Sequence, residues 1–270
     1  MRFTKMHGLG NDYVYVNCYE ESIEAPALVA KAVSDRHFGI GADGLILIQP
    51  SKKADCRMVM YNADGSRGAM CGNGIRCVGK YVYESGQVQT ARMNIETDSG
   101  IRRLFCRTRN GKVNLVDVEM GIPVVEKREV LEAGGRNFSF TPVNVGNPHA
   151  VLFYTDVESL DLTDLGPLLE RHERFPDRTN VEFAQVLDAQ NIRLRVWERG
   201  TGETMACGTG ACAACAAAIS MGLVKRKVVM HLTGGNLDIT WANPGGPMVM
   251  TGPAAEVFRG EISLKDFLKS

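Results

Sequence analysis

Two cysteines in matching glycine-rich contexts are the residues of this sequence best suited to chemistry. Cys71 opens the motif Cys-Gly-Asn-Gly, Cys207 opens Cys-Gly-Thr-Gly, and a glycine follows each cysteine 15 positions later. The residues in between have helical spacing or composition, so each cysteine is predicted to lie at a helix N-terminus. The unpaired N–H groups and the macrodipole at such a terminus favour a thiolate over a thiol. The pattern therefore predicts two thiols that exchange protons near neutral pH.

The glycines after each cysteine indicate what the thiols would act on. A backbone without bulky side chains lets a carboxylate approach the N–H groups of a helix N-terminus. If two such termini faced one ligand, they would hold its carboxylate and set one sulfur on each face of the neighbouring carbon. One thiolate could then remove an α-proton while the other thiol returned one.

The other cysteines are expected to be core residues. Most stand in apolar stretches where a cysteine behaves as a small hydrophobic side chain. They are Cys18, Cys56, Cys77, Cys106, Cys212 and Cys215. Cys212 and Cys215 have the spacing of zinc ligands, but they lie inside an apolar helical run without a second pair, so no metal site is expected.

An internal repeat relates the two cysteines. Four pairs of residues share a separation of 136 positions: Cys71 and Cys207, Gly86 and Gly222, Asn11 and Asn147, and Asn62 and Glu198. Several pairs in one register indicate a duplicated domain. We expect domains at residues 1–118 and 119–261, with residues 262–270 packing back on the first.

Each half is expected to be rich in strands around one principal helix, which gives an α+β fold. In the first half, strands are predicted at 13–16, 45–48, 57–61, 93–97, 101–107 and 113–118, with helices at 25–34 and 71–84. In the second half, strands are predicted at 150–153, 180–186, 192–197, 228–232, 237–241 and 248–251, with helices at 160–173 and from Cys207 to about Gly222.

Composition excludes several functions. The chain has 270 residues, 44% of them hydrophobic, and 31 basic residues balance 31 acidic ones. A chain without net charge gives no sign of binding nucleic acid or an anionic membrane. No signal peptide or apolar run of membrane-spanning length is present, so a cytoplasmic protein with free thiols is expected.

Three further side chains could serve the thiols or the ligand. His149 stands at the repeat position of Tyr13 and is a candidate for tuning a thiol, although a structural role is as plausible. Glu198 and Arg199 follow a predicted strand shortly before Cys207. They could bind an ammonium group and a carboxylate, or form an ordinary surface ion pair. No nucleotide-binding motif and no lysine in a context suited to a Schiff base are evident, so no cofactor is expected.

The motifs taken together resemble the diaminopimelate epimerase family, in order over nearly the whole chain. They are His7-Gly-Leu-Gly-Asn-Asp12, Gly39-Ile-Gly-Ala-Asp-Gly44, Tyr61-Asn-Ala-Asp-Gly-Ser66, Met70-Cys-Gly-Asn-Gly-Ile-Arg-Cys77, Asn144-Val-Gly-Asn-Pro-His149, Thr179-Asn-Val-Glu-Phe183 and the stretch from Glu198 to Ala211. The resemblance implies a cofactor-independent interconversion of LL- and meso-2,6-diaminopimelate in lysine and peptidoglycan precursor synthesis. It also implies two pseudo-symmetric domains, each a mostly antiparallel barrel-like sheet around a central helix, and a homodimer.

The resemblance further implies a role for each matching residue. Cys71 and Cys207 are the acid/base pair, and His149 and Glu198 flank the thiols. Binding of the reacting α-carboxylate falls to Gly72, Asn73, Gly208 and Thr209. Recognition of the rest of the substrate falls to Asn11, Asn62, Asn147, Asn180, Glu198 and Arg199.

The sequence departs from the family pattern at two places, and two alternative functions are compatible with the motifs. Gly44 stands where some members have Gln, and Arg67-Gly68 replaces a more acidic pair, so Arg67 could alter the field at Cys71. A related two-cysteine racemase acting on proline, hydroxyproline or histidine would use the same thiol chemistry, but the distal set around Glu198 and Arg199 favours diaminopimelate. A non-catalytic or isomerase-like scaffold of the same fold would be expected to lack one or both cysteines.

Overall fold

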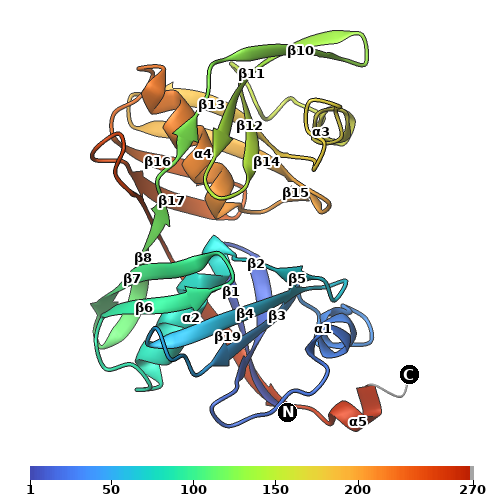
Figure 1. Ribbon diagram of the computed structural model, residues 1–270, viewed down its shortest axis with the longest axis vertical. Helices are drawn as coiled ribbons and strands as arrows, with labels where there is room; N and C mark the ends of the chain where they lie inside the picture. The colour runs from blue at the N-terminus through green and yellow to red at the C-terminus, as the bar shows by residue number, and fades with distance from the viewer. Residues whose placement is uncertain (268–270) are drawn as a thin grey trace. The chain divides into compact units, whose positions relative to one another are not determined.

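The computed structural model describes the backbone of residues 1–267 and the side chains of residues 1–265. The chain divides into two compact units (Figure 1), one formed by Met1–Val118 with Gly252–Ser270 and the other by Glu119–Thr251. Each unit has its own sheet and its own central helix.

The first unit is a curved sheet that wraps one helix. Its strands are β1 (Arg2–Gly8), β2 (Asn11–Asn17), β3 (Gly44–Gln49), β4 (Cys56–Asn62), β5 (Arg67–Gly68), β6 (Arg92–Thr97), β7 (Gly100–Arg109), β8 (Lys112–Gly121) and β19 (Ala255–Glu261). Its helices are α1 (Pro26–Ser34), α2 (Gly72–Glu84) and the short α5 (Leu264–Phe267). The order along the sheet is β19-β1-β2-β3-β4-β6-β7-β8, with β5 also paired to β4; β2–β3 and β4–β6 are parallel and the other pairs antiparallel.

Local sequence explains how the first unit builds its central helix and first hairpin. Leu9 and Gly10 both have positive φ, 57° and 86°, which suits the tight turn between β1 and β2. Helix α2 stops where Gly86 takes a φ of 77°, as expected of a glycine just past a helix end. Its apolar face packs against the neighbouring strands β1 and β2 and also against β7, which is far from them in the sheet order, so the sheet must curl around the helix.

The second unit repeats this plan. Its strands are β9 (Val124–Val125), β10 (Glu129–Ala133), β11 (Arg136–Asn144), β12 (Pro148–Phe153), β13 (Asn180–Asp188), β14 (Asn191–Glu198), β15 (Gly202–Thr204), β16 (Lys227–Leu232), β17 (Gly235–Thr240) and β18 (Met248–Gly252). Its helices are α3 (Leu162–Glu170) and α4 (Gly208–Ser220). The order is β10-β11-β12-β13-β14-β16-β17-β18, with β9 on β11 and β15 on β14; β12–β13 and β14–β16 are parallel and the other pairs antiparallel.

The duplication predicted from sequence is therefore present in the topology. Both α1 and α3, and both α2 and α4, begin and end 136 positions apart. The sequence of antiparallel and parallel pairings from β1 to β8 matches that from β11 to β18. The predicted α+β class, with a mostly antiparallel barrel-like sheet around a central helix in each unit, is confirmed.

Helix α4 is buried on every side. All residues from Ala211 to Ala218 have no solvent exposure, and the helix packs against β11, β12, β13, β14, β16 and β17. Alanines and cysteines are small enough to let strands approach the helix all round, which is why α4 shows no amphipathic stripe. The helix N-terminus is consequently held in place by most of the unit.

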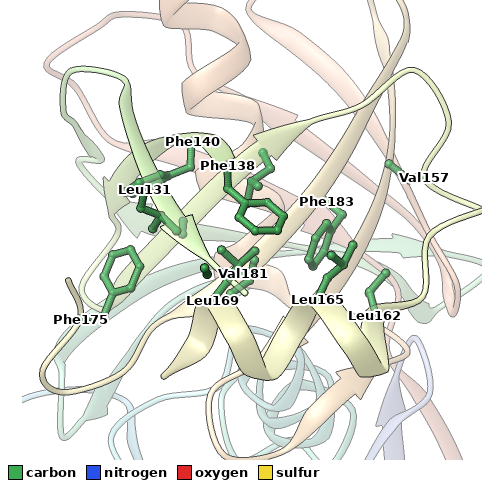
Figure 2. Close-up of a cluster of buried hydrophobic side chains, with 13 residues drawn as sticks. Leu131, Phe138, Phe140, Val157, Leu162, Leu165, Leu169, Phe175, Val181 and Phe183 are labelled. Carbon is green, nitrogen blue, oxygen red and sulfur yellow. The ribbon is translucent and has the colours of Figure 1, made fainter. Parts of the chain in front are cut away.

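A separate apolar cluster fixes α3 against the outside of the sheet. Figure 2 shows Leu165 and Leu169 of α3 pointing toward Phe138, Val181 and Phe183 of the strands. Burial of each such side chain contributes about 1.5–3 kcal/mol. This cluster anchors α3, whose C-terminal end supports the turn after β14.

The second unit ends earlier than expected from sequence. Its boundary falls at Thr251 and not at residue 261, because β19 forms an antiparallel pair with β1 of the first unit. Beyond β19, Ile262 exchanges backbone hydrogen bonds with Met1, and Leu264 packs against the core cluster that contains Val29. The last three residues of the expected 262–270 tail lie outside the described residues.

No helix within the described range is both long and apolar enough to cross a membrane.

Candidate active site

Cys71 caps the N-terminus of α2 with its own sulfur. Its extended backbone places Sγ 3.3 Å from the N–H of Gly74, which donates to it. The thiol in turn donates to Oδ1 of Asn11 at 3.2 Å, and the Asn11 amide is held by the Asp43 carboxylate at 2.8 Å. The first unit thus brings two of the predicted residues, Cys71 and Asn11, into direct contact.

The other predicted residues of the first unit lie at the start of α2 and the end of β4. Gly72 and Asn73 are the first two residues of the helix and are buried. Asn62 instead donates from its amide to the Ser66 hydroxyl at 2.9 Å, within its own turn. The Asn62 side chain is therefore oriented by the turn that follows β4.

The two departures from the family pattern have physical explanations. A Cβ at Gly44 would lie 2.1 Å from the carbonyl oxygen of Tyr61, so no side chain fits unless the backbone moves. Arg67 is paired with Asp98 at 2.5 Å and lies over the Tyr61 ring. This hydrogen bond lowers the pKa of Asp98 and neutralises much of the Arg67 charge.

Cys207 caps α4 with the same geometry. Its Sγ accepts the N–H of Gly210 at 3.4 Å and lies 3.4 Å from the Thr209 hydroxyl. Thr209 also accepts the side-chain amide of Asn147 at 3.5 Å. The second unit brings the predicted residues Cys207, Thr209 and Asn147 together, with Gly208 buried between the first two in sequence.

His149 is completely buried next to this cluster. Its Nε2 lies 3.0 Å from Oδ1 of Asn147, and its Nδ1 lies 2.7 Å from Oε1 of Glu182. Sequence reasoning missed Glu182, although it belongs to the motif Thr179-Asn-Val-Glu-Phe183. The internal repeat could have indicated Glu182, because the equivalent residue 136 positions earlier is the apolar Ile46, and an acidic residue in its place stands out.

The Glu198 carboxyl lies near the Cys207 thiol and affects its ionisation. Burial, the Glu198 carboxyl and Glu182 together raise the pKa of Cys207 well above its usual range, against the hydrogen bonds from Thr209 and Gly210. Burial also raises the pKa of Glu198, although Thr204 donates to its carboxyl at 2.6 Å. The N–H of Gly210 at the helix N-terminus favours the thiolate, as expected, but burial and the two carboxyls outweigh it at Cys207.

Arg199 and Asn180 form a second group at the turn after β14. The backbone N–H of Arg199 donates to the Asn180 side chain at 3.1 Å, and the Asn180 amide donates to the Pro148 carbonyl at 3.0 Å. The Arg199 guanidinium donates to the Asp177 carbonyl and is exposed. The turn itself is held from α3 by Glu170, which accepts the N–H of Gly200 at 2.9 Å and the Trp197 indole at 3.0 Å.

The remaining cysteines lie where sequence placed them. Cys56, Cys77, Cys106, Cys212 and Cys215 are buried, and Cys18 is half-buried. Burial raises the pKa of Cys77 to about 11 and that of Cys215 to about 12, so neither thiol ionises near neutral pH. These cysteines are inert packing residues.

Solved structures share this fold at low sequence identity. A probable proline racemase from Agrobacterium radiobacter has a TM-score of 0.77 and 16% identity, with 97% of this chain and 93% of that chain covered. A hydroxyproline epimerase from Agrobacterium vitis has a TM-score of 0.74 and 17% identity, with 96% and 91% covered. The fold is thus one that racemases and epimerases use.

Sequence comparison is more specific. A family model described as diaminopimelate epimerase matches residues 3–126 and 141–257. A diaminopimelate epimerase from Acetivibrio thermocellus is 49% identical over 279 residues, covering 98% of this chain and all of the relative. One from Methanococcus maripaludis is 50% identical over 277 residues with the same coverage. The chain belongs to the diaminopimelate epimerase family and is an isomerase.

Proposed function

We propose that this chain epimerises LL-2,6-diaminopimelate to the meso isomer by a two-base mechanism without a cofactor, with Cys71 and Cys207 as the acid and base. The observation that carries the proposal is the repeated cap. In both units a cysteine sulfur accepts the third N–H of the central helix, at 3.3 Å in one and 3.4 Å in the other. Each thiol is thereby fixed at the positive end of a helix dipole, where a sulfur can exchange a proton with a substrate carbon.

The helix N-termini supply the binding of the α-carboxylate. The first N–H groups of a helix have no acceptor within it, and a carboxylate is their natural partner. We assign this contact to Gly72 and Asn73 in α2 and to Gly208 and Thr209 in α4. The negative charge that develops next to this carboxylate on loss of the α-proton is stabilised by the same N–H groups.

Recognition of the rest of the substrate, including its distal amino-acid end, is assigned to polar residues around the two caps. Those residues are Asn11, Asn62, Asn147, Asn180, Glu198 and Arg199. Glu198 suits an ammonium group, and the exposed Arg199 guanidinium suits a carboxylate in a bidentate contact. Such a set matches the second amino-acid end of diaminopimelate, which proline and histidine do not possess.

The surroundings of Cys207 support the thiol form of this residue before reaction. A raised pKa keeps the proton on sulfur at neutral pH, so Cys207 is ready to donate it. His149 and Glu198 then influence how easily the resulting thiolate is formed. In the reverse direction the two cysteines exchange roles.

Incubation with LL-diaminopimelate in deuterated water tests the proposal. We expect meso isomer to form with one deuterium at the inverted α-carbon, and Cys71→Ala and Cys207→Ala each to abolish its formation. Proline, hydroxyproline and histidine in parallel incubations should remain unlabelled. Meso isomer formed at the full rate by either alanine variant would contradict the two-thiol mechanism.

We also propose that the enzyme works as a homodimer in the cytoplasm, as the family resemblance implies. Light scattering of the purified chain at micromolar concentration would show twice the chain mass of 29.5 kDa, and a monomer would contradict the proposal.

A further inference from the structure

A fully buried acid–histidine pair lies behind Cys207. The side chains of Glu182 and His149 both have no solvent exposure, and their facing atoms are 2.7 Å apart. Oε2 of Glu182 has no hydrogen-bond partner among the described residues. An acid–base pair taken wholly out of water adds little stability, and removal of one partner is costly. The pair therefore needs a reason other than stability.

The first unit shows that the fold does not require this pair. At the equivalent positions it carries Ile46 and Tyr13, which are also buried. A Cβ at Gly74 would lie 2.6 Å from the end of Ile46, and a Cβ at Gly210 would lie 2.9 Å from Oε1 of Glu182. The isoleucine and the glutamate thus occupy the same place beneath a helix N-terminus, and an uncharged pair fills it without any change of topology.

Hydrogen-bond contacts connect the pair to the thiol. His149 Nε2 faces Asn147 Oδ1 at 3.0 Å, the Asn147 amide faces Thr209 Oγ1 at 3.5 Å, and Thr209 Oγ1 lies 3.4 Å from Cys207 Sγ. Since Asn147 presents its oxygen to the ring, Nε2 must carry a proton. Each group can then donate to the next, and the last donor is the Thr209 hydroxyl on the sulfur.

We propose that Glu182 is a positioning residue for the proton transfer at Cys207. It shares a proton with Nδ1 of His149 and keeps the other ring proton on Nε2. Through Nε2 it orients the Asn147 amide and the Thr209 hydroxyl toward the sulfur. This inference rests on the proposed epimerisation, and the role concerns the chemical step and not the affinity for substrate.

The substitution Glu182→Gln tests the role without leaving a cavity. Glutamine has the same shape but no acidic proton, so it cannot share one with Nδ1 of His149. We expect kcat for epimerisation to fall roughly tenfold or more, less than the roughly 10²–10⁴-fold contributed by a group that transfers the proton itself, because Glu182 acts through other residues, while KM stays within about twofold. The melting temperature should remain within a few degrees of the wild-type value. An unchanged kcat would overturn the proposal.

A second set of variants separates the role from folding. His149→Tyr and Glu182→Ile alone each leave a buried group without its partner, so each should lower the melting temperature. The double variant H149Y/E182I reproduces the pair of the first unit and should recover stability but not kcat. Recovery of kcat in the double variant would show that the pair is only structural.

Measurements on the wild-type enzyme separate a failure of the proposed function from a failure of the role of Glu182. Wild-type activity together with full activity of Glu182→Gln would overturn the role of Glu182 alone. Failure of the wild type to incorporate deuterium from the solvent would overturn the proposed function, and this inference with it.

Discussion

The two thiols share a cap geometry but not an environment. Near Cys71 the repeat positions hold Tyr13, Ile46 and Asn62, which carry no charge at neutral pH. Near Cys207 the equivalent positions hold His149, Glu182 and Glu198, which can all ionise. A duplicated domain has thus kept the sulfur at the helix N-terminus in both copies, while these three positions carry ionisable side chains in only one of them.

The carboxyl of Glu198 should suppress ionisation of Cys207. Burial raises the pKa of this thiol most and the Glu198 carboxyl raises it further, so the variant Glu198→Gln should lower the pKa and increase the thiolate fraction at pH 8. A shift of one unit would raise the alkylation rate roughly tenfold. The measurement is the rate of iodoacetamide labelling of the Cys207 peptide between pH 7 and pH 10.

The control for this experiment is Glu203→Gln on the same hairpin. Glu203 is exposed and paired with Arg195, so its loss should leave the labelling of Cys207 unchanged. Unmodified Cys212 and Cys215, which lie in the same helix, would show that α4 stays folded. Slower labelling in Glu198→Gln would contradict the electrostatic explanation.

At the scale of elements, α3 holds the turn that carries Arg199. The helix packs so closely on Trp197 that a Cβ at Gly166 would lie 2.2 Å from the indole. Glu170, at the end of the helix, accepts from both the Trp197 indole and the Gly200 N–H. In the first unit the equivalent residue is Ser34, and the corresponding turn is held by its own Asn62 and Ser66.

Loss of Glu170 should therefore weaken binding of the distal end of the substrate. Glu170→Ala leaves two donors without an acceptor, which should lower the free energy of unfolding by about 1–3 kcal/mol. Arg199 would then be poorly placed, so KM for diaminopimelate should rise severalfold while kcat changes less. Steady-state kinetics and urea unfolding measure the two effects.

The stabilisation that Glu170 provides should depend on pH in a definite direction. Burial raises the pKa of Glu170, but the hydrogen bonds from Trp197 and Gly200, together with the charges of Arg171 and Arg178, outweigh it and lower the pKa. The stability that they supply is present above the unfolded pKa, about 4.3, and is lost as pH falls through the lower folded value. The difference between wild type and Glu170→Ala should thus be full at pH 7 and shrink in acid. Exposed Glu173→Ala is the control, and equal KM values in all three proteins would contradict the role.

At the scale of the whole chain, the sequence predicts those features that depend on local patterns or on the internal repeat. The Gly-X-Gly after each cysteine marks the start of α2 and α4, and Gly86 and Gly222 mark their ends, because caps and turns depend on neighbouring residues. Sequence does not reveal the His149–Glu182 contact, which joins residues 33 positions apart on adjacent parallel strands. Nor does it reveal where β19 pairs, since most of this strand is exposed and shows no alternation of buried and exposed positions.

Strand β19 makes the first unit depend on the end of the chain. It covers the edge of β1 from Arg2 to His7, and the Pro253 carbonyl before it accepts from the buried Arg76 of α2. A chain ending at Thr251 would leave the β1 edge unpaired and that guanidinium contact unmade. We therefore expect the first unit to lose its packing while the second, whose strands are all present, keeps its own.

Buried cysteines report on each unit separately. Cys56, Cys77 and Cys106 belong to the first unit and Cys212 and Cys215 to the second, and all are buried. In a chain ending at Thr251, iodoacetamide at pH 8 should label the first three and spare the other two. A chain ending at Ser263 keeps β19 and should protect all five, because it lacks only residues 264–270. Protection of Cys77 in the shorter chain would mean that the first unit folds without β19. Strand β19 would then serve only to cover the edge of the sheet.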